Sequence, residues 1–160
     1  MQPDKVLEIV PGLKQEWFAD GRMVGYKLTA MSPTILEAWS GCVLATIEAW
    51  DKSKPYLALH DLTAPTVPII YGSLTSYDML NIGVTMKGRR QVEDVFNAHS
   101  SFRAFVSIVF NLTLSGHIGK TLLNYYIDQH PSVKYKTFYS RERSMAWLLS
   151  QISPADNVTA

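Results

Sequence analysis

The stretch from Ser32 to Trp50 constrains the fold most, because it predicts a long amphipathic helix that another layer must cover. A serine followed by a proline is a common helix start, with the hydroxyl capping the first turn. Apolar residues then recur at steps of three and four positions, at Ile35, Leu36, Trp39, Cys42, Val43, Ile47 and Trp50. Because such a stripe is normally buried against a neighbouring layer, we expect the helix to lie on a sheet.

Three short strands are expected before this helix. The apolar-rich stretch from Lys5 to Val10 stops at Pro11-Gly12, a strong turn pair. The stretch from Leu13 to Phe18 is followed by Asp20-Gly21, which is a hairpin signal, and a third strand runs from Met23 to about Ala30. Together these strands predict an antiparallel meander.

Strands and helices alternate after the first helix. Strands are expected over Tyr56–His60, Phe102–Phe110 and Val133–Tyr139, and helices over Ile70–Asn81, Lys87–Ala98, Ser115–Gln129 and the residues after Ser140. Ser115 and Ser140 are expected to cap the last two helices, and Ile118 is expected on the core side of the first of them. This order predicts an α/β fold with one mixed sheet of about five to six strands, an N-terminal antiparallel meander and helices packed on the sheet. Residues 1–152 are expected to form a single domain and residues 153–160 a flexible tail.

Composition and charge exclude several classes of protein. The 160 residues carry 15 Lys and Arg against 14 Asp and Glu, and a net charge of +1 gives no reason to expect a nucleic-acid partner. One cysteine cannot form an internal disulfide or a multi-cysteine zinc site, which favours a reducing, cytoplasmic location. The apolar stretch from Phe102 to Leu114 is interrupted by polar residues and is too short to span a bilayer, so no membrane partner is expected.

The segment from Leu114 to Thr121, Leu-Ser-Gly-His-Ile-Gly-Lys-Thr, comes nearest to a chemical motif. It lies between a predicted strand and a predicted helix and ends in Gly-Lys-Thr, as phosphate-binding loops do. Leu114, however, stands where the first glycine of such a loop belongs, and leucine cannot cheaply adopt the backbone conformation required there. We therefore expect no nucleotide cofactor, and we interpret Lys120 as a solvent-exposed residue near a helix N-terminus.

Polar residues at the ends of predicted strands form the candidate ligand site. Open α/β sheets bind ligands at the carboxyl ends of their strands. The candidates are His60, Asp61, Thr63, Asn111 and Ser140. A structural role is the alternative for the first two, with Asp61 ending a turn or capping a helix and His60 making a partly buried hydrogen bond. The remaining histidines show no metal-ligand spacing and no Gly-x-Ser-x-Gly occurs, so neither a metal nor a catalytic set is expected.

Two further side chains are candidates for surface or core roles. Cys42 falls on the apolar face of the first helix, where cysteine behaves as a small hydrophobic residue, and it is interpreted as core. Trp17, on the first hairpin, does not follow the core pattern. It is a candidate for an exposed patch that binds a partner or a second copy of the chain.

Three segments suggest a family. Tyr56–Thr63 is an apolar strand ending in Asp-Leu-Thr, Phe102–Gln129 is a strand–helix unit, and Phe138–Leu149 is a strand followed by Glu-x-x-Ala-x-Trp-Leu with its spacing shifted by one. In these features the chain resembles the STAS-like family of anti-sigma-factor antagonists and related bacterial proteins. The phosphorylatable members carry an Asp-Ser-x-Gly-like turn, which Tyr71–Asp78 does not match. The resemblance therefore implies the fold and a regulatory role more than phosphorylation.

Two functions follow from these observations. The favoured one is a non-enzymatic regulatory or protein-interaction module of STAS-like fold, with a protein partner or a homodimer. The alternative is a carrier or sensor of a small apolar ligand, with its pocket at the strand ends and residues 67–86 as its cover. Enzymatic activity ranks third, because the sequence offers no catalytic constellation.

Overall fold

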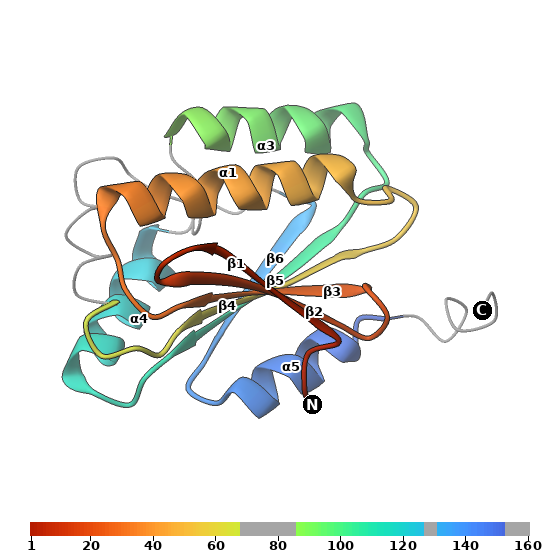
Figure 1. The fold of residues 1–160 in the computed structure, drawn as a ribbon. Helices are drawn as coiled ribbons and strands as arrows, with labels where there is room; N and C mark the ends of the chain where they lie inside the picture. Colours follow the sequence, from red (N-terminus) through yellow and green to blue (C-terminus); the bar gives the residue numbers. More distant parts are fainter. Residues whose placement is uncertain (68–85, 127–130, 153–160) are drawn as a thin grey trace.

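The computed structural model describes residues 1–67, 86–126 and 131–152, which form one mixed sheet with helices on both faces (Figure 1). The chain contributes in order β1 (Lys5–Val10), β2 (Leu13–Phe18), β3 (Met23–Leu28), α1 (Pro33–Ala49), β4 (Tyr56–Leu62), α3 (Met86–Ala98), β5 (Ala104–Phe110), α4 (Leu114–Tyr126), β6 (Val133–Phe138) and α5 (Arg141–Leu149). The predicted helix over residues 70–81 and the predicted tail lie outside the described residues.

The six strands lie side by side in the order in which they occur in the sequence. β1, β2 and β3 pair antiparallel, and β3, β4, β5 and β6 pair parallel. The predicted fold class is confirmed: the protein is a single α/β domain with an N-terminal meander and a mixed sheet.

The tight turns of the meander occur where the sequence predicts them. Gly12 and Gly21 both have positive φ, at 97° and 78°, a conformation that glycine adopts without a steric penalty. In the second hairpin the positive φ is not confined to glycine, because Ala19 and Asp20 adopt it as well. β2 therefore ends at Phe18, and a loop over residues 19–22 leads into β3.

Helix α1 covers one face of the sheet, as its apolar stripe predicts. The Ser32 hydroxyl accepts a hydrogen bond from the Ile35 amide over 3.2 Å, and Pro33 occupies the first turn. Trp39, Val43 and other stripe residues are buried against the sheet in the larger of two core clusters. Helix α3 lies beside α1 on the same face and adds Phe96 to this cluster (Figure 1).

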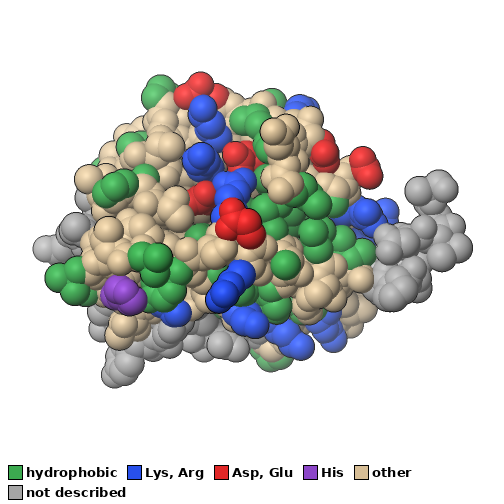
Figure 2. All heavy atoms as spheres, turned by 90° about the horizontal axis from the view of Figure 1, so that it is seen from below, with side chains coloured by type: hydrophobic (Ala, Val, Ile, Leu, Met, Phe, Trp, Pro, Cys, Tyr) green, Lys and Arg blue, Asp and Glu red, His purple; other side chains and the backbone are tan. Residues whose placement is uncertain are grey.

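Helix α5 covers the opposite face and builds the smaller cluster. Met145 and Leu148 of α5 pack there with Phe18, Leu57, Leu59 and Val109. Ser140 caps this helix by accepting from the Arg143 amide, as the sequence predicts. On this side of the molecule acidic and basic side chains are intermixed over the upper part of the view, and basic side chains line its lower edge (Figure 2).

Three predicted boundaries are wrong in instructive ways. β4 continues through Asp61 to Leu62, because the Asp61 carboxylate finds an ion-pair partner inside the fold. β5 begins at Ala104 rather than Phe102, because the Phe102 amide donates a hydrogen bond to the His99 carbonyl and so belongs to a turn. The structure describes α4 from Leu114, where the Thr113 hydroxyl accepts from the Gly116 amide, so Thr113 and not Ser115 caps this helix.

The orientation expected for α4 also needs correction. Ile118, expected on the core side, is 52% exposed, and Leu114 is exposed as well. The helix therefore turns part of its apolar surface outward. Among the described helices, none is long and apolar enough to cross a membrane.

Candidate functional site

A pocket of about 510 Å³ lies at the amino end of the parallel strands, between the β2–β3 hairpin and the end of α1. Its volume falls within the range typical of small-molecule sites. It is lined by Gln15, Trp17, Asp20, Gly21, Arg22, Cys42, Ala45, Thr46, Ala49, Trp50, Asp51, Lys54, Pro55, Leu57 and Ile152. The lining comes from five separate parts of the chain: β2 and its hairpin, α1, the loop after α1, the start of β4 and the residues after α5.

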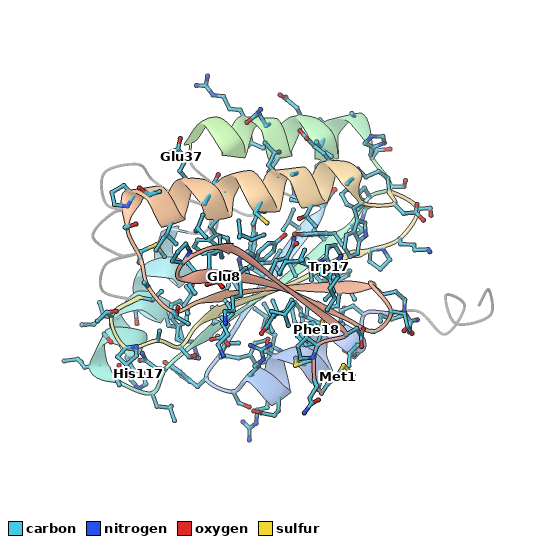
Figure 3. The ribbon with its side chains drawn as sticks, viewed as in Figure 1. Met1, Glu8, Trp17, Phe18, Glu37 and His117 are labelled. Carbon is cyan, nitrogen blue, oxygen red and sulfur yellow. The ribbon has the colours of Figure 1, made fainter. Side chains whose placement is uncertain are left out.

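Two tryptophans dominate the apolar lining. Trp17 of β2 and Trp50 at the end of α1 lie nearly parallel, with 11° between their rings and 6.1 Å between the ring centroids. Both are half-buried, so part of each ring is left accessible. Trp17 lies on the α1 side of the sheet and Phe18 on the α5 side, as the alternation of a strand requires (Figure 3).

A chain of hydrogen bonds fixes the polar groups below the tryptophans. The Trp17 Nε1–H donates to Gln15 Oε1 over 3.3 Å, and Gln15 Nε2 donates to Thr46 Oγ1 over 2.9 Å. Thr46 Oγ1 in turn donates to the Cys42 carbonyl over 2.7 Å. This chain holds the Trp17 ring in place and satisfies polar atoms that would otherwise face the pocket.

The end of α1 is fixed independently. Lys52 Nζ donates to the carbonyls of Ile47, Glu48 and Trp50 over 2.7 to 2.9 Å. These are carbonyls that a helix end leaves without intrahelical partners. The backbone that carries Trp50 is therefore held by an ionised donor, which makes stronger hydrogen bonds than a neutral one.

Four charged side chains line the pocket. Asp51 and Lys54 form an exposed ion pair with 3.7 Å between their charged atoms, while Asp20 and Arg22 come from the hairpin. Hydrogen bonds from Ser53 lower the pKa of Asp51, which keeps its carboxylate ionised at neutral pH. The four formal charges cancel, so the rim carries no net charge.

Cys42 and Ala45 supply small side chains on the α1 side of the pocket. Cys42 packs against the core, as predicted, but it is half-buried and also lines the pocket. Burial raises the pKa of its thiol, so at neutral pH it is a protonated, weakly nucleophilic group. Ala45 is exposed, and its small side chain leaves the pocket open.

The residues predicted to bind a ligand lie at the other end of the sheet. His60 points toward α1, where its ring lies 5.1 Å from that of Tyr26 and 5.3 Å from that of Trp39. It is almost completely buried, and its Nδ1 has no hydrogen-bond partner among the described residues. Burial lowers the pKa of His60 to about 3, so the ring is neutral at physiological pH.

Asp61 points to the opposite face from His60 and joins a buried charge cluster. Its Oδ2 accepts from Arg141 over 2.7 Å, and the same guanidinium pairs with Glu16 of β2. Its Oδ1 accepts from the amide and hydroxyl of Thr63. Burial lowers the pKa of Arg141, whereas the hydrogen bonds and charges of Glu16 and Asp61 raise it. The net effect is a raised pKa, so the side chain stays charged.

The other predicted residues make local contacts at this edge. Asn111 Nδ2 donates to the Thr63 carbonyl over 3.1 Å, while Asn111 Oδ1 accepts from the Thr113 amide. Ser140 caps α5 and donates to Glu142 over 2.6 Å. The structure thus brings Asp61, Thr63 and Asn111 into one hydrogen-bonded chain, and places His60 on the other face.

The Gly-Lys-Thr segment is engaged within the protein. Lys120 Nζ lies 4.3 Å from the centroid of the Tyr139 ring, whose hydroxyl is 2.7 Å from His117 Nδ1. The Thr121 hydroxyl donates to the His117 carbonyl one turn back. His117 lies on α4, at the end of the molecule away from the pocket (Figure 3). Lys120 is therefore half-buried against Tyr139 and not solvent-exposed as predicted. The contacts favour the interpretation of the segment as an ordinary helix start.

Comparisons of the chain with protein-family models, with curated proteins and with solved structures gave no match. Within the described ranges there is also no cluster of three His, Cys, Asp or Glu side chains that could hold a metal ion. The site must therefore be judged from its own geometry.

Five of the pocket residues were named from the sequence in other roles: Trp17 as part of an exposed patch, Cys42 and Trp50 in the apolar stripe of α1, and Asp20-Gly21 as a hairpin signal. One signal was available for the rest. Gly41, Ala45 and Ala49 recur at steps of four along α1 beside its apolar stripe, and all three are exposed. A row of small residues next to a buried stripe indicates room beside the helix, although it does not say what borders that room.

Proposed function

We propose that this protein is a non-enzymatic binding module that carries or senses a small apolar molecule in the pocket between the β2–β3 hairpin and α1. The observation that carries the proposal is the pocket itself, about 510 Å³ with its two half-buried tryptophans. Pockets that bind small molecules are mostly apolar, with a few polar groups at defined positions. The free cysteine, Cys42, supports a cytoplasmic location.

The fixed hydrogen bonds around the pocket support the same proposal. Gln15, Thr46 and Lys52 hold the lining in place from different elements. A lining that is already ordered loses little conformational entropy when a ligand binds. The pocket is therefore suited to reversible binding of a preferred shape.

The test uses decahydro-2-naphthol, a saturated bicyclic alcohol, titrated into the protein and followed by calorimetry and by NMR. We expect saturable binding, and we expect Ala45→Trp to abolish it by filling the pocket. Glu37→Trp is the matched control, because it places the same side chain at an exposed position near the other end of α1 (Figure 3). The control variant should bind as the unmodified chain does.

Alkylation of Cys42 gives a second measurement. Because Cys42 lines the pocket, the bound alcohol should slow its reaction with N-ethylmaleimide. Binding that is absent, or that survives Ala45→Trp unchanged, contradicts the proposed function.

A second candidate function is association through the free edge of β1, which is in keeping with the STAS-like resemblance and with a homodimer. Within the described residues β1 pairs with β2 alone, and Val6 and Leu7 are 48% and 38% exposed. The other edge strand, β6, exposes Lys134 and Lys136, which oppose pairing with a further strand.

Sedimentation equilibrium tests this second function. We expect a dimer that dissociates on Leu7→Lys, because a lysine at the edge opposes strand pairing. A monomer at all concentrations of the unmodified chain contradicts self-association through β1.

A further inference from the structure

We propose that the pocket selects uncharged, flat aromatic ring systems over saturated molecules of the same size, because they stack on the wall formed by Trp17 and Trp50. This inference rests on the proposed ligand-binding function and specifies the chemical class of the ligand. It is carried by the geometry of the two indoles, by the way they are held, and by the charges that surround them.

The two indoles stack on each other with nearly parallel ring planes, and part of each ring remains accessible at the pocket. Their planes differ by 11°, and neither ring is completely buried. Offset stacking on an aromatic face gives a flat ring an advantage beyond the area it buries. A puckered ring system of equal size gains the buried area but not the stacking.

The wall is rigid enough to discriminate between shapes. The Trp17 ring is held through Nε1 by Gln15, which is itself buried and held by Thr46. Trp50 and Tyr56 form a T-shaped pair, with 87° between the ring planes and 5.0 Å between the centroids. Tyr56 is buried and shares a hydrogen bond of 3.2 Å with the Tyr26 hydroxyl. Neither indole can turn freely to fit a bulky aliphatic ligand.

The surroundings favour an uncharged ligand. The charges of Asp20, Arg22, Asp51 and Lys54 cancel, so the rim offers no net attraction to an anion or a cation. The polar atoms of Gln15 and Thr46 are already hydrogen-bonded to each other and to neighbouring groups. A charged ligand would lose hydration and would meet rim charges of both signs.

The experiment compares 2-naphthol with decahydro-2-naphthol, which has the same carbon skeleton without the aromatic rings. On the unmodified chain we expect 2-naphthol to bind about three- to tenfold more tightly. Trp17→Leu keeps the wall apolar but removes one indole, so it should bring the two affinities close together. Trp17→Phe should restore part of the difference.

Three further measurements make the outcome decisive. Circular dichroism and thermal melting establish that each Trp17 variant is folded. Stacking should move the NMR signals of the 2-naphthol ring protons upfield in the unmodified chain and less so in Trp17→Leu. Naphthalene-2-sulfonate, flat but charged, should bind more weakly than 2-naphthol.

The possible results separate the two proposals. Equal affinities for the two alcohols, or a preference that survives Trp17→Leu, overturn the selectivity for flat rings and leave the apolar pocket standing. Tighter binding of the sulfonate than of 2-naphthol overturns the preference for uncharged ligands. If neither alcohol binds, both the selectivity and the proposed function are wrong.

Discussion

The guanidinium of Arg141 donates to Asp61 Oδ2 over 2.7 Å across 80 positions of sequence, and it also pairs with Glu16. This arrangement joins β2, β4 and α5 at the carboxyl end of the parallel strands. Both carboxylates are buried, and the Arg141 side chain is 24% exposed. Removal of the arginine would leave two like charges inside the fold without a counterion.

We predict that Arg141→Met lowers the free energy of unfolding by about 2–4 kcal/mol, since the uncompensated buried carboxylates outweigh the partial exposure of the pair. Denaturant unfolding measures the loss. The neighbouring exposed variant Arg143→Met should change stability by less than about 0.5 kcal/mol. Adding Asp61→Asn to Arg141→Met should recover part of the loss, and failure to do so would show that the charges are not its cause.

The buried His60 should make the protein sensitive to acid. Its pKa is lowered by burial to about 3 from an ordinary value of 6.5. The unfolded chain therefore binds a proton below about pH 6.5, while the folded chain does not until the pH approaches 3. The stability associated with neutral His60 is fully present above pH 6.5 and is lost as the pH falls toward 3, by up to about 1.4 kcal/mol per pH unit.

His60→Phe tests this prediction, because phenylalanine keeps an aromatic ring beside Tyr26 and Trp39 without a titratable group. Urea unfolding at pH 7.5 should show a small change, and the difference between the variant and the unmodified chain should shift in favour of the variant as the pH is lowered from 6 to 4. Parallel pH profiles for the two proteins would mean that His60 does not set the acid sensitivity.

Two helical glycines should respond oppositely to alanine. A Cβ added at Gly116 would overlap the carbonyl of Asn111, whereas one at Gly41 meets no atom within 4 Å. We predict that Gly41→Ala stabilises the protein by about 0.5–1 kcal/mol, through reduced freedom of the unfolded chain. Gly116→Ala should destabilise it by about 1–3 kcal/mol, because the start of α4 must move away from β5. Thermal melts of the two variants test this prediction. Melting temperatures that shift in the same direction would contradict the opposite effects expected at Gly41 and Gly116.

A buried pair of hydroxyls links α5 to the sheet and should behave asymmetrically. Ser144 Oγ donates to Ser107 Oγ over 2.6 Å, and Ser107 Oγ lies 3.4 Å from the Ala58 carbonyl, to which it donates. Ser107→Ala leaves the buried Ser144 donor without its acceptor and should cost about 1–3 kcal/mol. Ser144→Ala removes that donor and should cost less, and the double variant should be less destabilised than Ser107→Ala alone. Additive losses in a double-mutant cycle would show that the two hydroxyls act independently.

Much of the architecture could be predicted because the apolar pattern repeats with the period of each element. The stripe from Ile35 to Ile47 identifies α1, and the turn pairs at Gly12 and Gly21 divide the meander. The errors at the starts of β5 and α4 involve local hydrogen bonds, from Phe102 to His99 and from Gly116 to Thr113, whereas the error at the end of β4 involves a distant contact. β4 extends past His60 because Arg141 neutralises Asp61. An ion pair between residues 80 positions apart cannot be predicted from the local sequence pattern.

The two ends of the sheet differ in how far they could be predicted. Asp61, Thr63 and Asn111 were grouped correctly at one edge, because parallel strands all place their carboxyl ends there. The alternation of a strand also places His60 and Asp61 on opposite faces, so these two neighbours cannot share a pocket. Trp17 was singled out from the sequence for an exposed patch and Trp50 was named only as part of the apolar stripe, so the stacking of the two rings was not predicted.

The order of apolar and polar residues specifies the kind of layers that form, because hydrophobic periodicity dictates which face of each strand and helix must leave water. Where those layers fail to meet depends on how they pack in three dimensions. The pocket exists because Trp17 of β2, Ala45 and Trp50 at the end of α1, and Ile152 after α5 come from three segments far apart in the chain and leave a gap at the amino end of the parallel strands. Periodicity specifies the buried face of one element at a time, whereas a cavity depends on the shapes of several elements packed together.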